Sequence, residues 1–268
     1  MIALLFDEVS ESLGGLILRF LSFVGGVTFL AKEMWSNLWT RPFYPILLVE
    51  QIYQIGIRSM SLVSATALST GAVMALQFGY GLERFGGKYY VPKVVALSLV
   101  RELGPVFTSL MLAGRIGAGI TAEIGSMNVT QQIDAIRALG TSPIKKIVIP
   151  RVLGCLIVLP LLTVIANFIG IMGSLVICNL ELGLDPLFFY QKVIYTVTLT
   201  DFVVGVAKTL FFAAFISLVG CYYGMRTTGG TQGVGVATTR SVVTSSIMIV
   251  ISDFVLTKLF WIFEKWMS

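Results

Sequence analysis

VLGCLIVLPLLTVIANFIGIMGSLVIC, residues 152–178, contains no charged side chain, and the fold depends on this stretch. A helix needs about 20 mostly apolar residues to cross the hydrocarbon core of a bilayer. The stretch is longer than that, so it predicts a membrane-spanning helix. The whole chain is 56% hydrophobic and 12% charged, whereas ordinary soluble domains are about 25% charged. This composition is typical of a membrane protein.

Four further stretches have the same apolar character. They are residues 60–78, 94–113, 202–223 and 242–263. The few charges inside them are Arg101, Glu102, Lys208, Asp253 and, near the end of the last stretch, Lys258. We therefore predict an all-α membrane protein with five transmembrane helices and no further folded domain.

The N-terminal segment 13–31 is apolar but is interrupted by glycines and by Arg19. Its apolar residues recur at helical spacing, at Leu13, Ile17, Phe20 and Val24. This pattern favours an amphipathic helix that lies along the membrane surface over a sixth span. We accordingly divide the chain into an N-terminal interfacial region, residues 1–45, and a transmembrane domain, residues 46–268.

The charges between the spans predict the topology. Eleven Lys and Arg residues lie on the side of the N-terminus, and six lie on the other side. Because positive loops stay in the cytoplasm, we expect a cytoplasmic N-terminus and an external C-terminus. The basic residues are scattered and do not alternate with exposed aromatics, which argues against a nucleic-acid-binding role.

The residue types argue against catalysis and metal binding. The chain has no histidine, the commonest general base and metal ligand. Its three cysteines, Cys155, Cys178 and Cys221, are far apart in apolar stretches without metal-ligand spacing. We expect no metal site and no catalytic residue, and we interpret the cysteines as small buried hydrophobic residues.

GRIGAGITAEIGSMNVTQQIDAIRALGTSPIKKIVIP, residues 114–150, is the longest and most polar connection. It predicts a short cytoplasmic helix at about 128–140, capped by Asn128 or Thr130 and ended by Gly140. Its apolar residues form one edge, made of Ile133, Ile136 and Leu139. The helix could rest on the membrane or dock into a partner as a coupling helix. The phosphate-binding pattern GxxxxGK[ST] is absent, so ATP, if used, must bind to a separate subunit.

The charges inside the spans are costly, at about 3 kcal/mol each on insertion scales. They should therefore face the protein interior or a wet cavity. Glu102 with Lys208, or Lys208 with Asp253, could form ion pairs that fix the helix register. Alternatively, the same groups line a transport pathway, and a proton relay through them would serve an ion-gradient-driven secondary transporter.

Several motifs resemble one known family. They are RELGPV at 101–106, AGRIGAGITAEIG at 113–125, QIDAIRALGTSPI at 132–144, ATTR at 237–240 and SDFVLT at 252–257. Together they resemble the MlaE/YrbE permeases, the integral membrane subunits of ABC lipid transporters that work with an MCE-domain protein. The resemblance extends over residues 49–260, and the block 113–144 is its most specific part.

The resemblance implies a homodimeric permease in the bacterial inner membrane, with its C-terminus in the periplasm. Separate ATPase subunits would bind ATP and Mg²⁺ and dock on the coupling helices, so this chain would hold no cofactor. A hexameric ring of MCE-domain protein would sit on the outer face, and a small STAS-like subunit would bind the ATPase. The cargo would be phospholipid or a related hydrophobic molecule, moved between inner and outer membranes.

The resemblance also implies three sets of site residues. A lipid pathway would contain Met74, Gln77, Leu82, Phe85, Arg101 and Glu102, and a charge network would contain Glu102, Lys208 and Asp253. The ATPase-coupling set would be Glu123, Gln132, Ile133, Asp134, Ile136, Arg137 and Leu139. Arg101 could bind a lipid phosphate, whereas Met74 and Phe85 could equally serve ordinary helix packing. Gly81 and the charged pair 83–84 depart from the family pattern.

Overall fold

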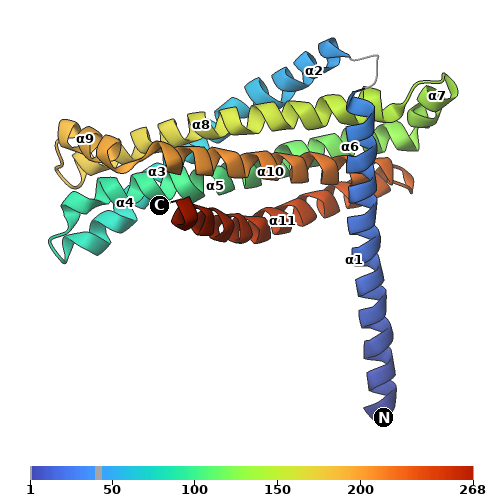
Figure 1. The fold of residues 1–268 in the computed structure, drawn as a ribbon, viewed down its shortest axis with the longest axis horizontal. Helices are drawn as coiled ribbons and strands as arrows, with labels where there is room; N and C mark the ends of the chain where they lie inside the picture. The colour runs from blue at the N-terminus through green and yellow to red at the C-terminus, as the bar shows by residue number, and fades with distance from the viewer. Residues whose placement is uncertain (1, 40–43, 268) are drawn as a thin grey trace.

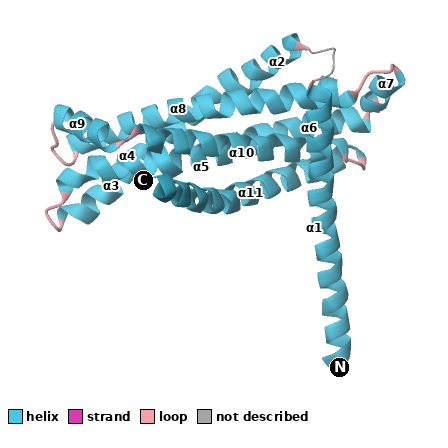
Figure 2. Cartoon of the chain, viewed as in Figure 1, coloured by secondary structure: helices cyan, strands magenta, loops and turns pink. Residues whose placement is uncertain are grey.

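The computed structural model describes residues 2–39 and 44–267, which form helices joined by short turns, with no strand among them (Figures 1 and 2). Five helical stretches are long and apolar enough to cross a membrane, which confirms the predicted number. They are Pro45–Glu83, Lys88–Val129, Ile144–Leu180, Leu199–Met225 and Gly230–Phe263.

Most spans consist of several helical pieces. The first joins α2 (Pro45–Ile52), a π-helical turn (Tyr53–Ile57) and α3 (Arg58–Glu83). The second joins a 3-10 turn (Lys88–Tyr90), α4 (Val91–Ser98), a π-helical turn (Leu99–Leu103), α5 (Gly104–Leu112), a π-helical turn (Ala113–Gly117) and α6 (Ala118–Val129). The third is a π-helical turn (Ile144–Val148) with α8 (Ile149–Leu180), and the others are α10 (Leu199–Met225) and α11 (Gly230–Met267).

The second span is much longer than the sequence suggested. Residues 114–129 continue it as helix, whereas their polar sequence predicts a connection between spans. Tertiary packing explains this, because Ile120 and Ile124 are buried against α10. Gly220 of α10 permits the contact, since a Cβ there would lie 3.3 Å from the Gly117 carbonyl oxygen. Close packing on small residues therefore overrides the low helix propensity of glycine.

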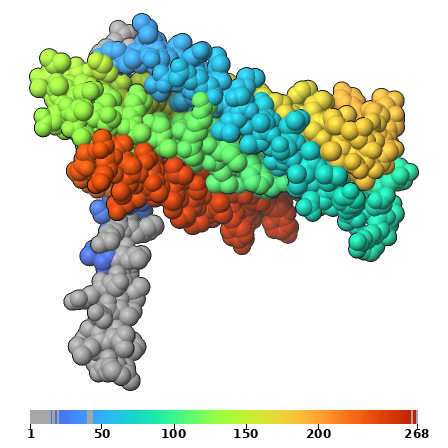
Figure 3. Space-filling model, turned by 180° about the vertical axis from the view of Figure 1, so that it is seen from behind, coloured from blue at the N-terminus to red at the C-terminus, as the bar shows by residue number. Residues whose placement is uncertain are grey.

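The core is centred on α8, which has buried residues along most of its length and packs along α3. Gly71 of α3 faces the Gly170 backbone of α8, and Gly173 faces the Leu68 carbonyl. These glycines bring the two helices close enough for van der Waals contact between backbones, which drives helix association in lipid. On the opposite side, α11 forms an outer strip of the bundle (Figure 3).

The N-terminal helix α1 (Ile2–Leu38) runs across one end of the bundle, where it contacts α10 (Figure 1). Leu30 is buried there, and the Phe23 ring lies 5.4 Å from Tyr222 and 5.7 Å from Tyr223. A helix that crosses the spans at one end can lie along the membrane surface, as we predict. The side chains of Leu13, Ile17 and Phe20 lie outside the described residues, so this apolar stripe stays a prediction.

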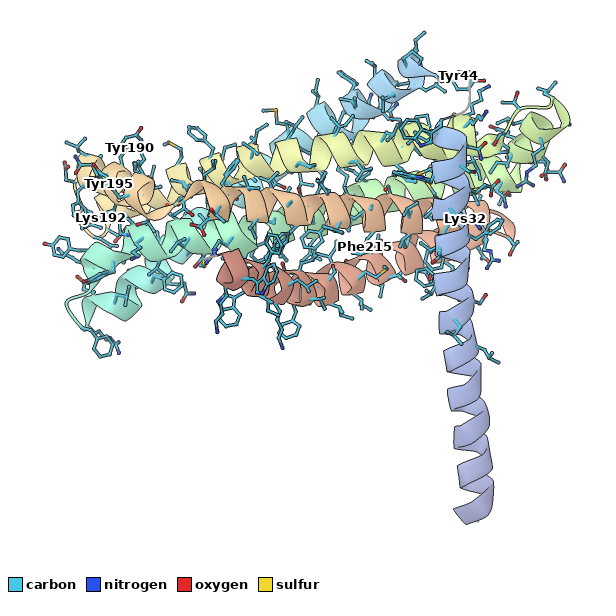
Figure 4. All side chains as sticks on the ribbon, viewed as in Figure 1. Lys32, Tyr44, Tyr190, Lys192, Tyr195 and Phe215 are labelled. Atoms are coloured by element: carbon cyan, nitrogen blue, oxygen red, sulfur yellow. The ribbon has the colours of Figure 1, made fainter. Side chains whose placement is uncertain are left out.

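Helix α9 (Pro186–Thr196) was not anticipated. It lies at the end of the bundle opposite α7 (Gln132–Ala138), and Figure 4 labels three of its side chains, Tyr190, Lys192 and Tyr195. Asp185 caps it, since its Oδ2 accepts a hydrogen bond of 3.0 Å from the Phe188 amide. Proline at the first helical position completes a start signal that the sequence does contain.

We expect Gly71→Ala to lower the melting temperature of the purified protein, because the added methyl would overlap the Gly170 backbone. Gly81→Ala is the matched control on the same helix, since no atom lies within 4 Å of its Cβ position. Thermal unfolding in detergent measures both. Equal melting temperatures for the two variants would contradict the close contact between α3 and α8.

Candidate functional site

Lys208 of α10 is the centre of the candidate site, and only 1% of its side chain is exposed. Its Nζ lies 2.6 Å from Glu102 Oε2 and 3.0 Å from Asp253 Oδ1. The same Nζ donates to Thr257 Oγ1 at 2.7 Å. Both ion pairs that the sequence left open therefore form around one ammonium. The buried charge is paired and hydrogen-bonded, as a low-dielectric site requires.

The local structure of the second span supplies a further acceptor for Lys208. In an α-helix the amide of residue 105 would bond to the carbonyl of residue 101. Pro105 has no N–H, and Lys208 Nζ lies 3.3 Å from the Arg101 carbonyl oxygen. The π-helical turn Leu99–Leu103 carries Arg101 and Glu102 at this position, and such turns are frequent at functional sites.

Arg101 has its own partner, which sequence analysis missed. Its Nε lies 2.8 Å from Asp201 Oδ1, and 39% of the Arg101 side chain remains exposed. Asp201 also belongs to a capping box at the start of α10, where its Oδ2 accepts from the Thr198 amide at 3.0 Å. The spacing of Thr198 and Asp201 was a visible capping signal, but it gave no sign of the pair with Arg101.

A cavity of about 80 Å³ connects these groups. Its lining is Arg101, Glu102, Val204, Lys208, Thr257, Phe260 and Trp261. The space suits a few water molecules and is too small for a whole lipid. Within residues 2–39 and 44–267, no group of three or more His, Cys, Asp or Glu side chains could hold a metal ion.

The predicted pathway residues of the first span face different directions. Met74 and Leu82 are partly buried and pack against the second apolar cluster of the core. Gln77 is exposed, and Phe85 is 87% exposed. The structure thus joins Arg101 and Glu102 to the Lys208 cluster. Of the other four predicted residues, two pack in the core and two are exposed.

A short helix, α7, lies where the sequence predicted one, but its start differs from our prediction. Gln131 takes a left-handed conformation (φ 59°) directly before it, and neither Asn128 nor Thr130 caps it. Asn128 Nδ2 instead donates to the Thr227 carbonyl at 2.9 Å, and Thr130 Oγ1 donates back to its own helix. Gly140 ends the segment with φ 73°, as predicted.

The apolar edge of α7 does not form one surface. Ile133 is 1% exposed and Ile136 is partly buried, so both anchor α7 to the bundle, whereas Leu139 is 82% exposed. The Ile133 side chain fills the interior of this chain, and its role in ATPase coupling stays a prediction. The polar predicted residues Gln132, Asp134 and Arg137 are exposed.

Two ion pairs involve predicted coupling residues. Arg137 and Asp134 form an exposed pair of 3.0 Å along α7. Glu123 Oε1 lies 2.7 Å from Arg151 Nη2, so Glu123 joins α6 to a buried arginine of α8. Exposed pairs contribute little to stability, so the first is available to a partner at small cost.

Comparisons with known proteins agree on one family. The Permease MlaE family matches residues 48–259. A probable ABC transporter permease protein of Rickettsia felis is 38% identical over 95% of this chain and 98% of its own length. One from Synechocystis is 40% identical over 78% of this chain and 80% of its own. The chloroplastic protein TRIGALACTOSYLDIACYLGLYCEROL 1 of Arabidopsis thaliana is 34% identical over 80% of this chain and 61% of its own.

We expect the double variant Glu102→Gln with Asp253→Asn to lose about 3–5 kcal/mol of stability, because it leaves the Lys208 ammonium buried without a counter-charge. Adding Lys208→Met should recover much of this loss, since no buried charge then remains. Thermal unfolding of the three proteins tests both steps. A double variant as stable as the parent would show that the cluster contributes no stability.

Proposed function

The chain belongs to the MlaE permease family, and we propose that it moves phospholipids or related hydrophobic molecules between the inner and outer membranes. It is a multi-pass ABC transporter permease by relationship and by its five spans. The observation that carries the lipid proposal is the buried Lys208 cluster, which opens through a small cavity to Arg101. The Arabidopsis relative adds support, because its name contains the name of a glycolipid.

The site has the chemistry that a lipid pathway needs. Arg101 is partly exposed beside its ion pair with Asp201, and a guanidinium can bind a phosphate by bidentate hydrogen bonds. Phe260 and Trp261 line the same cavity and offer apolar surface to a lipid tail. The exposed side chains of Gln77, in the first span, and Phe85, just after it, would extend this surface towards a second copy in a homodimer.

ATP would act through a partner subunit that also holds Mg²⁺. Helix α7 projects beyond the spans at one end of the bundle (Figure 1), and it exposes Leu139, Asp134 and Arg137. An exposed leucine beside charged groups is a suitable anchor for a docking protein. The other proposed partners are an MCE-domain ring on the outer face and a STAS-like subunit on the ATPase.

The proposed setting is the bacterial inner membrane, with the N-terminus in the cytoplasm and the C-terminus in the periplasm. The loop charges support this orientation, and α1 and α7 lie towards the same end of the bundle (Figure 1). A secondary transporter driven by an ion gradient is not favoured, because the relatives named above are ABC transporter permeases.

We expect Arg101→Gln to slow phospholipid transfer about tenfold, because a charge-assisted contact to phosphate is lost. Transfer of a labelled phospholipid by the reconstituted complex measures this. Lys192→Gln on α9 removes an exposed charge elsewhere and should leave the rate unchanged. A folded Arg101→Gln complex with the parental rate would remove Arg101 from the pathway.

Leu139→Asp should weaken association with the ATPase subunit at least about tenfold, since it replaces an exposed apolar anchor by a charge. Co-purification of the ATPase with the permease measures this. Leu180→Asp, at the exposed end of α8, is the matched control and should bind normally. If both variants retained the ATPase equally, the docking role of α7 would be refuted.

A further inference from the structure

A second cavity, of about 290 Å³, lies where α1 crosses the bundle, and none of its lining residues belongs to the Lys208 cluster. Its walls come from α1, from the end of α10, and from α7 with the segment that follows it. The apolar part of the lining includes Phe29, Leu30, Ile144 and Met225. The polar part is Glu33, Arg137, Arg226 and the hydroxyl-bearing Tyr222. The cavity is therefore amphiphilic, with charges of both signs.

Arg226 is the best-positioned cation of this cavity. Its Nη1 donates to the Tyr222 hydroxyl at 2.6 Å, and its guanidinium carbon lies 4.9 Å from the centre of the Tyr222 ring. Tyr222 is itself buried and packs against Phe23 of α1. The guanidinium is thus held in place while one of its five N–H donors is used on Tyr222, and the others suit a phosphate.

Arg137 contributes less, because it already forms an ion pair of 3.0 Å with Asp134. Glu33 supplies a carboxylate from α1, whereas Arg226 is the residue that follows the last turn of α10. A ligand with one phosphate and one nearby ammonium would satisfy Arg226 and Glu33 together. An anion alone would leave Glu33 facing a like charge, which costs free energy.

We propose that this cavity binds the phosphoethanolamine headgroup of a membrane phospholipid, with the phosphate on Arg226 and the ammonium on Glu33. The apolar lining, Phe29 and Leu30 among it, receives the start of the acyl chains. Because α1 crosses the spans at one end of the bundle (Figure 1), we place the cavity beside it at the level of the lipid headgroups. In the proposed orientation, the cavity faces the cytoplasmic leaflet. A lipid bound there stabilises the junction between α1 and α10. The proposal does not require transport activity.

The test measures which lipids the full chain retains. The complex with its accompanying subunits is placed in nanodiscs that contain equal amounts of phosphatidylethanolamine and phosphatidylglycerol, and it is then released from them without ATP. Native mass spectrometry counts the retained lipids. The parent should prefer phosphatidylethanolamine, and Arg226→Gln should reduce its retention about tenfold. Glu33→Gln should remove the preference over phosphatidylglycerol. Arg240→Gln and Glu50→Gln, both exposed and outside this cavity, should behave like the parent.

Unchanged phosphatidylethanolamine retention in both Arg226→Gln and Glu33→Gln would overturn the proposal. The proposal would also be overturned if Arg226→Gln kept its phosphatidylethanolamine but no longer co-purified with the ATPase subunit. The cavity would then be a docking site for that protein. Since no ATP is present, a chain that fails to transport lipid can still show this binding, and the two proposals fail separately.

Discussion

The need to neutralise one buried ammonium constrains the whole bundle. Lys208 is fully enclosed, and a charge in that position requires counter-charges and acceptors within hydrogen-bond distance. Glu102 comes from the second span and Asp253 from the fifth, whereas Lys208 lies on the fourth. Three spans are thereby fixed in register by contacts that apolar packing alone would not specify. Burial of a charge in a membrane protein is costly, so its retention fits a functional centre.

The geometry around Lys208 depends on irregular helix. The π-helical turn Leu99–Leu103 and Pro105 interrupt the regular hydrogen bonding of the second span beside the site. In lipid a freed carbonyl needs another donor, and the Lys208 ammonium provides one for Arg101. Gly205 of α10 faces the Val100 carbonyl, so the fourth span can approach the irregular turn closely. The irregular helix and the buried charge therefore both support the contact between the second and fourth spans.

Much of this arrangement could be predicted from the sequence, and the failures have physical causes. Apolar length identified five spans, and the cost of buried charge identified the partners of Lys208. Helical spacing placed Ile133 and Leu139 on one edge, but it carries no information about depth, and one is buried while the other is exposed. The pair of Arg101 with Asp201 joins residues far apart in the chain, so no local pattern could reveal it.

The second span offers a mechanical link between the two ends of the molecule. It is helical from Lys88 to Val129, and α7 begins three residues later. Ile133 anchors α7 in the core, and Glu123 ties the same span to Arg151 of α8. Under the proposed function, a displacement of α7 by the ATPase would move this span as a unit. The π-helical turn with Arg101 and Glu102 lies on the same span, so beyond the short turn before α7 that displacement would reach the Lys208 cluster through helix alone. Packed, continuous helix is the kind of element that can carry such coupling over a long distance.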